Sequence, residues 1–490
     1  MDIGSLFTGP GGWVAGVGTL ALYALGAAMA LDAVMKTRTP QGATAWVFAL
    51  ATVPLVAVPL YLVFGRSQFD DYVRALRRLD AEVEAGVARI HEGPFAPLLV
   101  SDAADADDDR QQDERRAFGR MATLPFTRGN GARLLVDGEQ TFDALFAAID
   151  AAERYVLAQF YIVHDDRIGA AFRERLEAAA GRGVAVRLLY DGVGSWRLGR
   201  AYRRSLEAAG VEVASFTGPR SWLKKLRLNF RNHRKIVVVD GRVGFTGGLN
   251  VGDEYLGRDP DIGPWRDTHL AVEGPVVQGL QLSFVQDWYY ARRERLDGLV
   301  WEPEASDEDR RALVLASGPV DELETCGLLY THAIESAEER VWIATPYFVP
   351  DGRVLGALQL AALRGVDVRV LMPRASDSVF FKFVPYAYLD DVARVGGKVH
   401  LYERGFMHQK VALVDRDFAV VSTANLDNRS FRLNFEATVV FEDADFCDRV
   451  EAMLEADFAR STRLQREDLE GRSFPFRLAV NATRLLAPVL

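Results

Sequence analysis

The chain repeats its own pattern, and this duplication restricts the possible fold more than any other feature of the sequence. Residues 153–163 (ERYVLAQFYIV) and 339–349 (ERVWIATPYFV) are matching apolar runs of the kind that form buried strands. Each run is followed by a helical pattern and then by a second strand; the helices are expected at 168–180 and 354–363, and the strands at 185–191 and 367–373. Alternating strands and helices predict an α/β fold. A repeat of this length predicts two similar α-β-α halves packed about a pseudo-twofold axis.

Four residue types recur at the same spacing in both halves. A histidine is followed by a lysine two residues later, by an aspartate five residues after that, and by an asparagine ten residues further on. The first set is His233, Lys235, Asp240 and Asn250, and the second is His408, Lys410, Asp415 and Asn425. One such set in an apolar strand is usually incidental. The chain has only seven histidines, so two of them in matching positions of a repeat indicate a shared site.

The residue types of these motifs suit phosphoryl chemistry. Residues two apart in a strand point to the same face, so each lysine is expected beside its histidine. Packing of the two halves would bring two imidazoles and two ammonium groups into one pocket, where they could stabilise the negative charge of a phosphoryl transition state. One imidazole can attack phosphorus while the other protonates the leaving alkoxide. Because ammonium groups repel metal ions and cannot ligate them, the site is expected to use no metal and no other cofactor.

The two motifs resemble the HxK(x)4D signature of the phospholipase D superfamily, including the trailing asparagine. Other segments are similar to bacterial cardiolipin synthases, so the resemblance covers nearly the whole chain: 36–40 (KTRTP), 62–66 (LVFGR), 265–269 (WRDTH), 345–350 (TPYFVP) and 424–431 (ANLDNRSF). Gly248, Ser422 and Thr423 replace residues of the Gly-Ser pair that is usual in the family. All three are small, so no loss of activity is expected.

The resemblance implies transfer of a phosphatidyl group. His233 would attack one phosphatidylglycerol and release glycerol, and the hydroxyl of a second phosphatidylglycerol would displace the histidine and give cardiolipin. His408 would act first as general acid and then as base. The groups expected to hold the phosphate are Lys235, Lys410, Asn250, Asn425, Gly248 and Thr423. Asp240 and Asp415 either orient a histidine, as a carboxylate does in other two-step transfers, or make a local salt bridge or turn contact; both interpretations remain open.

Two long stretches near the N-terminus, residues 3–31 and 39–65, contain no charged side chain. A bilayer span needs about 20 apolar residues, so helices at 13–31 and 43–64 are expected to form a transmembrane hairpin. A signal peptide would start with basic residues, which are missing here, and a buried core hairpin would rarely be so free of charge. The basic residues that flank the spans favour a cytoplasmic body on a bacterial inner membrane: Lys36 and Arg38 in the loop against Arg66, Arg74, Arg77 and Arg78 after the second span.

The expected domain plan is two transmembrane helices (1–66), a charged helix and linker (67–119), and two phospholipase D-like halves (120–315 and 316–490, the second with a C-terminal tail). Residues 70–91 form the expected charged helix, and 101–116 are too polar to bury and are expected to be a linker. The basic and aromatic segment 222–227 is either a solvated face or, as we favour, a contact with anionic headgroups. The tail, 474–490, fits either an interfacial helix or a docked terminal helix.

Composition excludes some classes of function. The net charge of −10 disfavours a nucleic-acid binder, and the two cysteines, Cys326 and Cys447, have no spacing typical of a disulfide framework or metal site. Phosphatidylglycerol and an anionic phospholipid membrane are the expected partners. The alternatives are a hydrolytic phospholipase, another phosphatidyltransferase such as a phosphatidylserine-type synthase, a nuclease, and a non-catalytic lipid-binding scaffold. The hairpin disfavours the nuclease and the two complete motifs disfavour the scaffold, whereas the sequence does not determine the oligomeric state.

Overall fold

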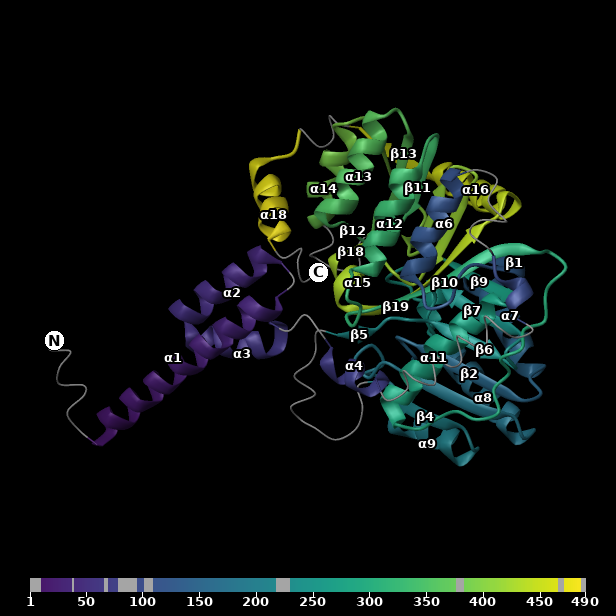
Figure 1. Ribbon diagram of the computed structural model, residues 1–490, viewed down its shortest axis with the longest axis horizontal. Helices are drawn as coiled ribbons and strands as arrows, with labels where there is room; N and C mark the ends of the chain where they lie inside the picture. Colours follow the sequence, from purple (N-terminus) through teal and green to yellow (C-terminus); the bar gives the residue numbers. More distant parts are fainter. Residues whose placement is uncertain are drawn as a thin grey trace. The chain divides into compact units, whose positions relative to one another are not determined.

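The computed structural model describes residues 10–37, 39–65, 69–77, 95–100, 109–216, 230–375, 383–465 and 471–485. The chain divides into two compact units. The smaller consists of Met1–Val73 with Pro219–Phe230, and the larger of Arg74–Gly218 with Arg231–Leu490. Figure 1 shows the elements of both units, which are described separately below.

One sheet of 16 strands runs through the larger unit. Its main path is β20-β14-β13-β11-β16-β17-β19-β10-β1-β9-β7-β6-β2-β3-β4, and β5 (Arg231–Asn232) pairs with β19 beside this path. The first half supplies β1 (Thr127–Val136), β2 (Tyr155–Phe160), β3 (Ala185–Tyr190), β4 (Glu212–Ser215), β6 (Ile236–Val239), β7 (Val243–Gly247) and β9 (Thr268–Glu273). The second half supplies β10 (Arg310–Ser317), β11 (Arg340–Ala344), β13 (Asp367–Pro373), β14 (Lys398–Tyr402), β16 (Val411–Val414), β17 (Phe418–Ser422), β19 (Asn434–Glu442) and β20 (Ser461–Leu464).

The sequence duplication is also a duplication of strand order. Outward from the centre, the first half has β1, β9, β7, β6, β2, β3 and β4, and the second has their counterparts β10, β19, β17, β16, β11, β13 and β14. Each half contains a parallel β-α-β core, in which β2 pairs with β3 and β11 with β13. The strands and helices expected from the repeat are therefore confirmed.

The two halves meet where β1 pairs with β10 in the antiparallel direction. Asn130 is buried at this junction. Its amide nitrogen donates to the carbonyl oxygens of Thr127 and Arg310 at 2.8 and 2.9 Å, and its side-chain oxygen accepts from the backbone N–H of Val276 at 2.7 Å. Since backbone hydrogen bonds cross the junction, the halves share one continuous sheet.

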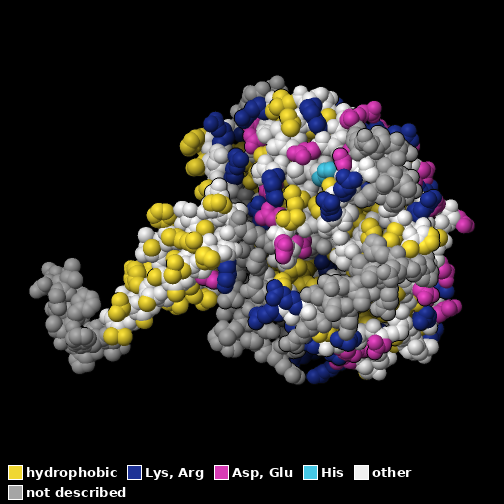
Figure 2. All heavy atoms as spheres, viewed as in Figure 1, with side chains coloured by type: hydrophobic (Ala, Val, Ile, Leu, Met, Phe, Trp, Pro, Cys, Tyr) yellow, Lys and Arg dark blue, Asp and Glu magenta, His cyan; other side chains and the backbone are white. Residues whose placement is uncertain are grey.

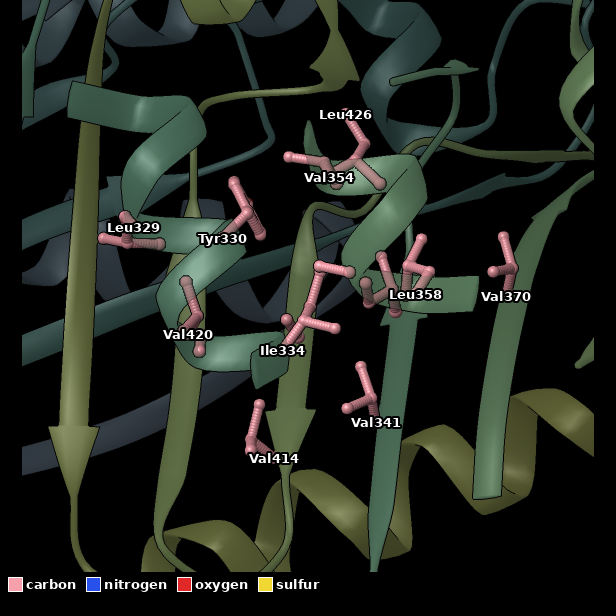
Figure 3. Packing of buried hydrophobic residues seen from close by; sticks show 14 of the residues in the cluster. Leu329, Tyr330, Ile334, Val341, Val354, Leu358, Val370, Val414, Val420 and Leu426 are labelled. Atoms are coloured by element: carbon pink, nitrogen blue, oxygen red, sulfur yellow. The ribbon is translucent and has the colours of Figure 1, made fainter. Parts of the chain in front are cut away.

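Each half has its own apolar core between the sheet and its helices. In the first half Phe172 and Leu176 of α8 (Arg167–Gly181) join Val237 of β6. In the second half side chains of α12 (Thr325–Ser336) and α13 (Gly352–Leu363) pack on β11, β13, β16 and β17 (Figure 3). Further helices of the body include α7 (Asp137–Asp150), α9 (Arg200–Ala208), α11 (Val276–Arg292), α14 (Val384–Ala393), α15 (Asn428–Arg432) and α16 (Ala444–Phe458).

The structure differs from the linker expected over 101–116. Residues 101–108 lie outside the described part, but α6 spans Asp109–Met121. Arg115, of which 1% is exposed, pairs with Glu442 at 2.7 Å, and Phe118 packs on Phe418. A buried ion pair and one phenylalanine therefore attach this highly charged helix to the second half, a tertiary effect that composition does not reveal.

The smaller unit contains α1 (Pro10–Lys36), α2 (Pro40–Thr52) and α3 (Pro54–Phe64). Among the described residues only one helix, over Gly16–Lys36, is long and apolar enough to cross a membrane. The single helix expected at 43–64 is instead two helices of 13 and 11 residues. Val53 leaves the helical conformation because it precedes Pro54, which has no N–H to continue the hydrogen bonding. Most exposed side chains of this unit are apolar (Figure 2).

Other expectations fall partly on described residues. Residues 222–227 lie outside them, as do 78–91, so the expected charged helix is seen only as α4 (Asp70–Leu76). For the tail, the structure shows a docked helix, α18 (Phe474–Arg484), in which Phe476 packs on Tyr386 of α14 with ring centroids 5.3 Å apart. Residues 486–490 are not described.

Asp240 and Asp415 have a local structural role. Asp240 accepts hydrogen bonds from the backbone N–H groups of Glu153, Arg154 and Tyr155 at 2.8–2.9 Å, where β2 begins. Asp415 makes the same three contacts at the start of β11, with 338, 339 and 340. These contacts support the local interpretation, and the carboxylates that contact the two histidines are Glu436 and Asp267.

We expect Asp240→Ala to lower the free energy of unfolding by about 2–4 kcal/mol, because three backbone donors lose a charged acceptor. Denaturant unfolding followed by tryptophan fluorescence would measure this. The matched control is Asp448→Ala, which removes an exposed partner of Arg416 and should change stability by less than about 0.5 kcal/mol. Equal stability of the two variants would contradict the structural role.

Candidate active site

Each motif is held by a strand of the opposite half. The residues before the first motif form β5, which pairs with β19, and those before the second form β15 (Phe406–Met407), which pairs with β8 (Trp265–Arg266). The pairings continue into the histidines. The backbone N–H of His233 donates to the Phe435 carbonyl at 2.9 Å, and that of His408 donates to the Arg266 carbonyl at 2.7 Å. Both histidines therefore lie where the halves meet.

Each imidazole is also held by a carboxylate of the opposite half. Nδ1 of His233 lies 3.0 Å from both carboxylate oxygens of Glu436, and Nδ1 of His408 lies 2.8 Å from Oδ2 of Asp267. Both carboxylates are completely buried. A carboxylate on Nδ1 favours the tautomer that carries its hydrogen there, which leaves the lone pair on Nε2. The arrangement thus presents two Nε2 atoms as nucleophile or base.

The two carboxylates stay ionised despite burial. Burial opposes ionisation of Glu436, but His233, Lys235 and Thr423 outweigh it and lower the pKa of Glu436 to about 2. Ser430 donates a further hydrogen bond to this carboxylate at 2.9 Å. Burial likewise raises the pKa of Asp267, but His408 and Lys410 have the larger combined effect and the pKa is lowered.

Gly248 and Thr423, expected at the phosphate, occupy equivalent positions beside these carboxylates. A Cβ atom at Gly248 would lie 1.9 Å from Oδ1 of Asp267, so only glycine leaves room for this side chain. Thr423 donates its hydroxyl hydrogen to Glu436 and accepts the backbone N–H of Ala437 at 2.9 Å. These contacts explain why small residues occupy both positions, and the explanation does not require a bound phosphate.

The two lysines are buried next to their histidines. Nζ of Lys235 donates to the backbone carbonyl of His233 at 2.7 Å, and Nζ of Lys410 lies 3.0 Å from the ring nitrogens of His408. Burial lowers the pKa of Lys235 to about 7. Glu436 opposes this effect, and Lys410 adds to it. Burial is also the main cause that lowers the pKa of His233 to about 4 and that of His408 to about 3, and the lysines add to it. The histidines are therefore neutral at physiological pH.

The two asparagines differ in their contacts. Asn250 is already engaged, since its side-chain oxygen accepts the backbone N–H of Ile162 and its amide nitrogen donates to the Tyr255 hydroxyl, each at 3.1 Å. The buried side-chain oxygen of Asn425 has no hydrogen-bond partner among the described residues. Asn425 therefore has a free acceptor, which suits a ligand hydroxyl and cannot hold a phosphoryl oxygen.

The middle residue of each motif contacts a buried aspartate on a long helix. Arg234 pairs with Asp287 of α11 at 2.9 Å. In the second half Gln409 donates to Asp457 of α16 at 2.9 Å, and the positive charge comes from Arg266 of the first half, at 2.7 Å from the same carboxylate. Arg266 and Asp267 thus form one cross-half contact that fixes both α16 and His408.

Aromatic rings complete the walls of the site. The ring centroid of Tyr161 lies 4.9 Å from that of His233, and the Trp265 centroid lies 5.0 Å from that of His408.

The sequence did not reveal Glu436 and Asp267 as site residues, although Asp267 lies within the segment WRDTH that carries part of the family resemblance.

Among the described residues one group has the spacing of a metal site, namely His164, Asp166 and Glu254. Its members already have partners: His164 pairs with Glu254 at 3.2 Å, and Asp166 caps α8 through the backbone N–H of Gly169 at 2.9 Å. Of the remaining histidines, His269 is buried in β9 and His332 contacts Phe118. None of these belongs to the paired motifs.

We expect His233 and His408 to be neutral at about pH 6, with the hydrogen on Nδ1, because burial disfavours the charged ring. NMR of isotope-labelled histidine would show this, with assignments from His233→Asn and His408→Asn. His164 is the internal control, since its hydrogen bond to Glu254 raises its pKa, so it should be charged in the same sample. A His233 signal that titrates like a free imidazole would contradict the prediction.

Comparisons with known proteins agree with this geometry. A family model described as cardiolipin synthase, PLD-like domain, matches residues 145–288 and 330–458, one stretch in each half. A second, described as phospholipase D-nuclease N-terminal, matches residues 24–66. A solved structure of phosphatidylserine synthase from Haemophilus influenzae covers 77% of this chain and 100% of its own, with a TM-score of 0.56 and 14% identity, which shows likeness of fold alone.

Two curated relatives are similar over nearly their full length. Cardiolipin synthase A of Pseudomonas fluorescens is 44% identical over 96% of this chain and 97% of its own. Cardiolipin synthase A of Pseudomonas aeruginosa is 45% identical over 96% of this chain and 95% of its own. The resemblance in the two motifs is thereby confirmed, and the chain belongs to the phospholipase D-like cardiolipin synthase family.

Proposed function

We propose that this chain is a cardiolipin synthase that transfers a phosphatidyl group between two phosphatidylglycerol molecules through a phosphohistidine. One observation carries the proposal: two imidazoles, each fixed through Nδ1 by a carboxylate of the opposite half, lie beside two buried lysines. Such a pair supplies a nucleophile and a separate acid and base. The curated relatives named cardiolipin synthase A support the choice of substrate.

In the first step Nε2 of His233 attacks phosphorus and the bond from phosphorus to the glycerol oxygen breaks. His408 gives that oxygen a proton, so glycerol leaves and a phosphatidyl-histidine remains. The negative charge of the bound phosphodiester opposes the effects of burial and of the lysines, and so favours the protonated His408 that this step needs. We assign the nucleophile to His233 because Glu436 is anchored by Thr423 and Ser430 as well.

In the second step neutral His408 takes the proton from a hydroxyl of the second phosphatidylglycerol. The freed oxygen attacks phosphorus, the bond to Nε2 of His233 breaks, and cardiolipin forms. Lys235 and Lys410 hold the phosphoryl oxygens, whose negative charge increases in both transition states. The matching strand order of the halves supports a pseudo-twofold arrangement of these groups around phosphorus.

Labelled phosphatidylglycerol in mixed micelles should give cardiolipin and glycerol with the wild type. His233→Ala and His408→Ala should each lower the rate by about a thousandfold or more, since they remove the nucleophile and the proton donor. The matched control is His400→Gln, because the ring of His400 packs on Phe458, outside the motifs. Thin-layer chromatography and mass spectrometry would identify the products.

The outcomes separate the candidate functions. Phosphatidic acid alone would make the chain a hydrolase, and no turnover by folded wild type would refute phosphatidylglycerol as substrate. Acid quenching followed by peptide mass spectrometry would find the phosphatidyl adduct on the peptide with His233 or on that with His408, and the latter result would reverse the assignment of nucleophile.

We propose further that the smaller unit anchors the chain in a bacterial inner membrane as a two-span hairpin with a cytoplasmic body. The first span would be α1, and α2 with α3 would cross together as a second span kinked at Pro54. The match of residues 24–66 to the N-terminal family model supports an anchor, and the basic residues after the second run support the orientation.

For this topology we expect a membrane-impermeant maleimide to label Gln41→Cys on intact spheroplasts, because residue 41 lies at the outer end of the hairpin. Arg128→Cys, on an exposed site of the body, should react only after permeabilisation. The native Cys326 and Cys447 are buried and should give little background. Labelling of residue 41 only after permeabilisation would exclude the hairpin in this orientation.

A further inference from the structure

The docked helix α18 has apolar side chains on two opposite faces. Phe476 and Val480 face α14, where Val480 is buried. Phe474, Leu478 and Leu485 are 73%, 58% and 82% exposed. At 3.6 residues per turn these three positions fall within about 40° of one another and nearly opposite the docked face. Packing on α14 therefore accounts for one apolar face and leaves the other in contact with solvent.

All charged side chains of this segment are positive. Residues 471–485 contain Arg472, Arg477 and Arg484 and no acidic residue, in a chain whose net charge is −10. Arg477 lies beside the exposed apolar stripe, at about a quarter turn from it. Arg484 instead pairs with Asp391 of α14 at 3.7 Å and lies over the ring of Tyr388, so it helps to dock the helix. Arginine stems can lie along an apolar surface while the guanidinium groups reach phosphate oxygens. An apolar stripe bordered by a cation, here Arg477, on a segment without acidic residues is the pattern of a helix in the plane of an anionic membrane surface.

The neighbouring layer adds to the same pattern. In Figure 1, α14 lies between α18 and α13, and α13 carries two leucines, Leu360 and Leu363, that are 52% and 69% exposed. Most exposed large apolar side chains described in the larger unit belong to α13 and α18 or directly follow α18; the others are Trp196, Trp301 and Leu323. The apolar surface of the catalytic body is thus concentrated on one helical layer.

We propose that α18 is a second membrane contact of this protein, in which Phe474, Leu478 and Leu485 enter the interface of an anionic bilayer while α14 holds the helix on the catalytic body. This contact is additional to the N-terminal anchor and does not depend on the proposed reaction. It would keep the second half of the body at the surface of the membrane. A docked helix needs no folding on binding, so the contact costs little ordering entropy.

The test uses the full chain in vesicles that contain phosphatidylglycerol. A spin label at Leu478→Cys should be more accessible to oxygen than to a water-soluble nickel reagent, which places it in the bilayer. The matched control is Leu323→Cys, a leucine of similar exposure (61%) on a loop of the same unit, and its label should be water-accessible. Arg477→Gln, or vesicles of phosphatidylcholine alone, should reduce the oxygen preference of the label at residue 478.

Two results would overturn the proposal. A label at residue 478 that is as water-accessible as the one at residue 323 would show that the stripe stays in solvent. Dipolar broadening between labels of two molecules would show that a second copy of the chain covers it. Neither result bears on the formation of cardiolipin, so failure of this proposal can be distinguished from failure of the proposed function.

Discussion

The crosswise pairing of histidine and carboxylate is the interaction on which the rest of the site depends. Glu436 of the second half holds His233, and Asp267 of the first half holds His408. Neither imidazole would be oriented by its own half alone. The continuous sheet, closed between β1 and β10, gives this exchange a rigid frame, and the pairings of β5 with β19 and of β8 with β15 bring each motif to its partner.

The active site contains several charged side chains that are buried away from water. Lys235, Lys410, Glu436 and Asp267 are all buried, and removing each such ion from water costs several kcal/mol after relaxation. The opposite charges offset part of this cost, yet the pKa of Lys235 is still lowered to about 7. An anionic phosphodiester would favour the charged lysines, so a site that is unfavourable when empty is already arranged for a phosphate.

The sequence predicted the groups that repeat locally and missed those that pair at long range. Equal spacing revealed the histidines and lysines, and the repeated strand pattern predicted the two similar halves. Glu436 and Asp267 lie 203 and 141 residues from the histidines they hold, so no local pattern marks them. The role of Asp240 could not be decided from the sequence, because an aspartate suits a contact with the backbone as well as a contact with a histidine. The break in the second apolar run at Pro54 could have been predicted from the sequence, since a residue that precedes proline rarely stays helical.

Arg266 also bears on how the two halves could have diverged. In the first half the charge on Asp287 is balanced by Arg234 of the same half, whereas Asp457 depends on an arginine of the other half. The position equivalent to Arg266 is Phe435, over whose ring Arg234 lies. A homodimer of second halves would leave Asp457 without a cation, and a homodimer of first halves would place two arginines on each Asp287. The duplicated segments have become complementary parts, so the gene can no longer be divided into interchangeable copies.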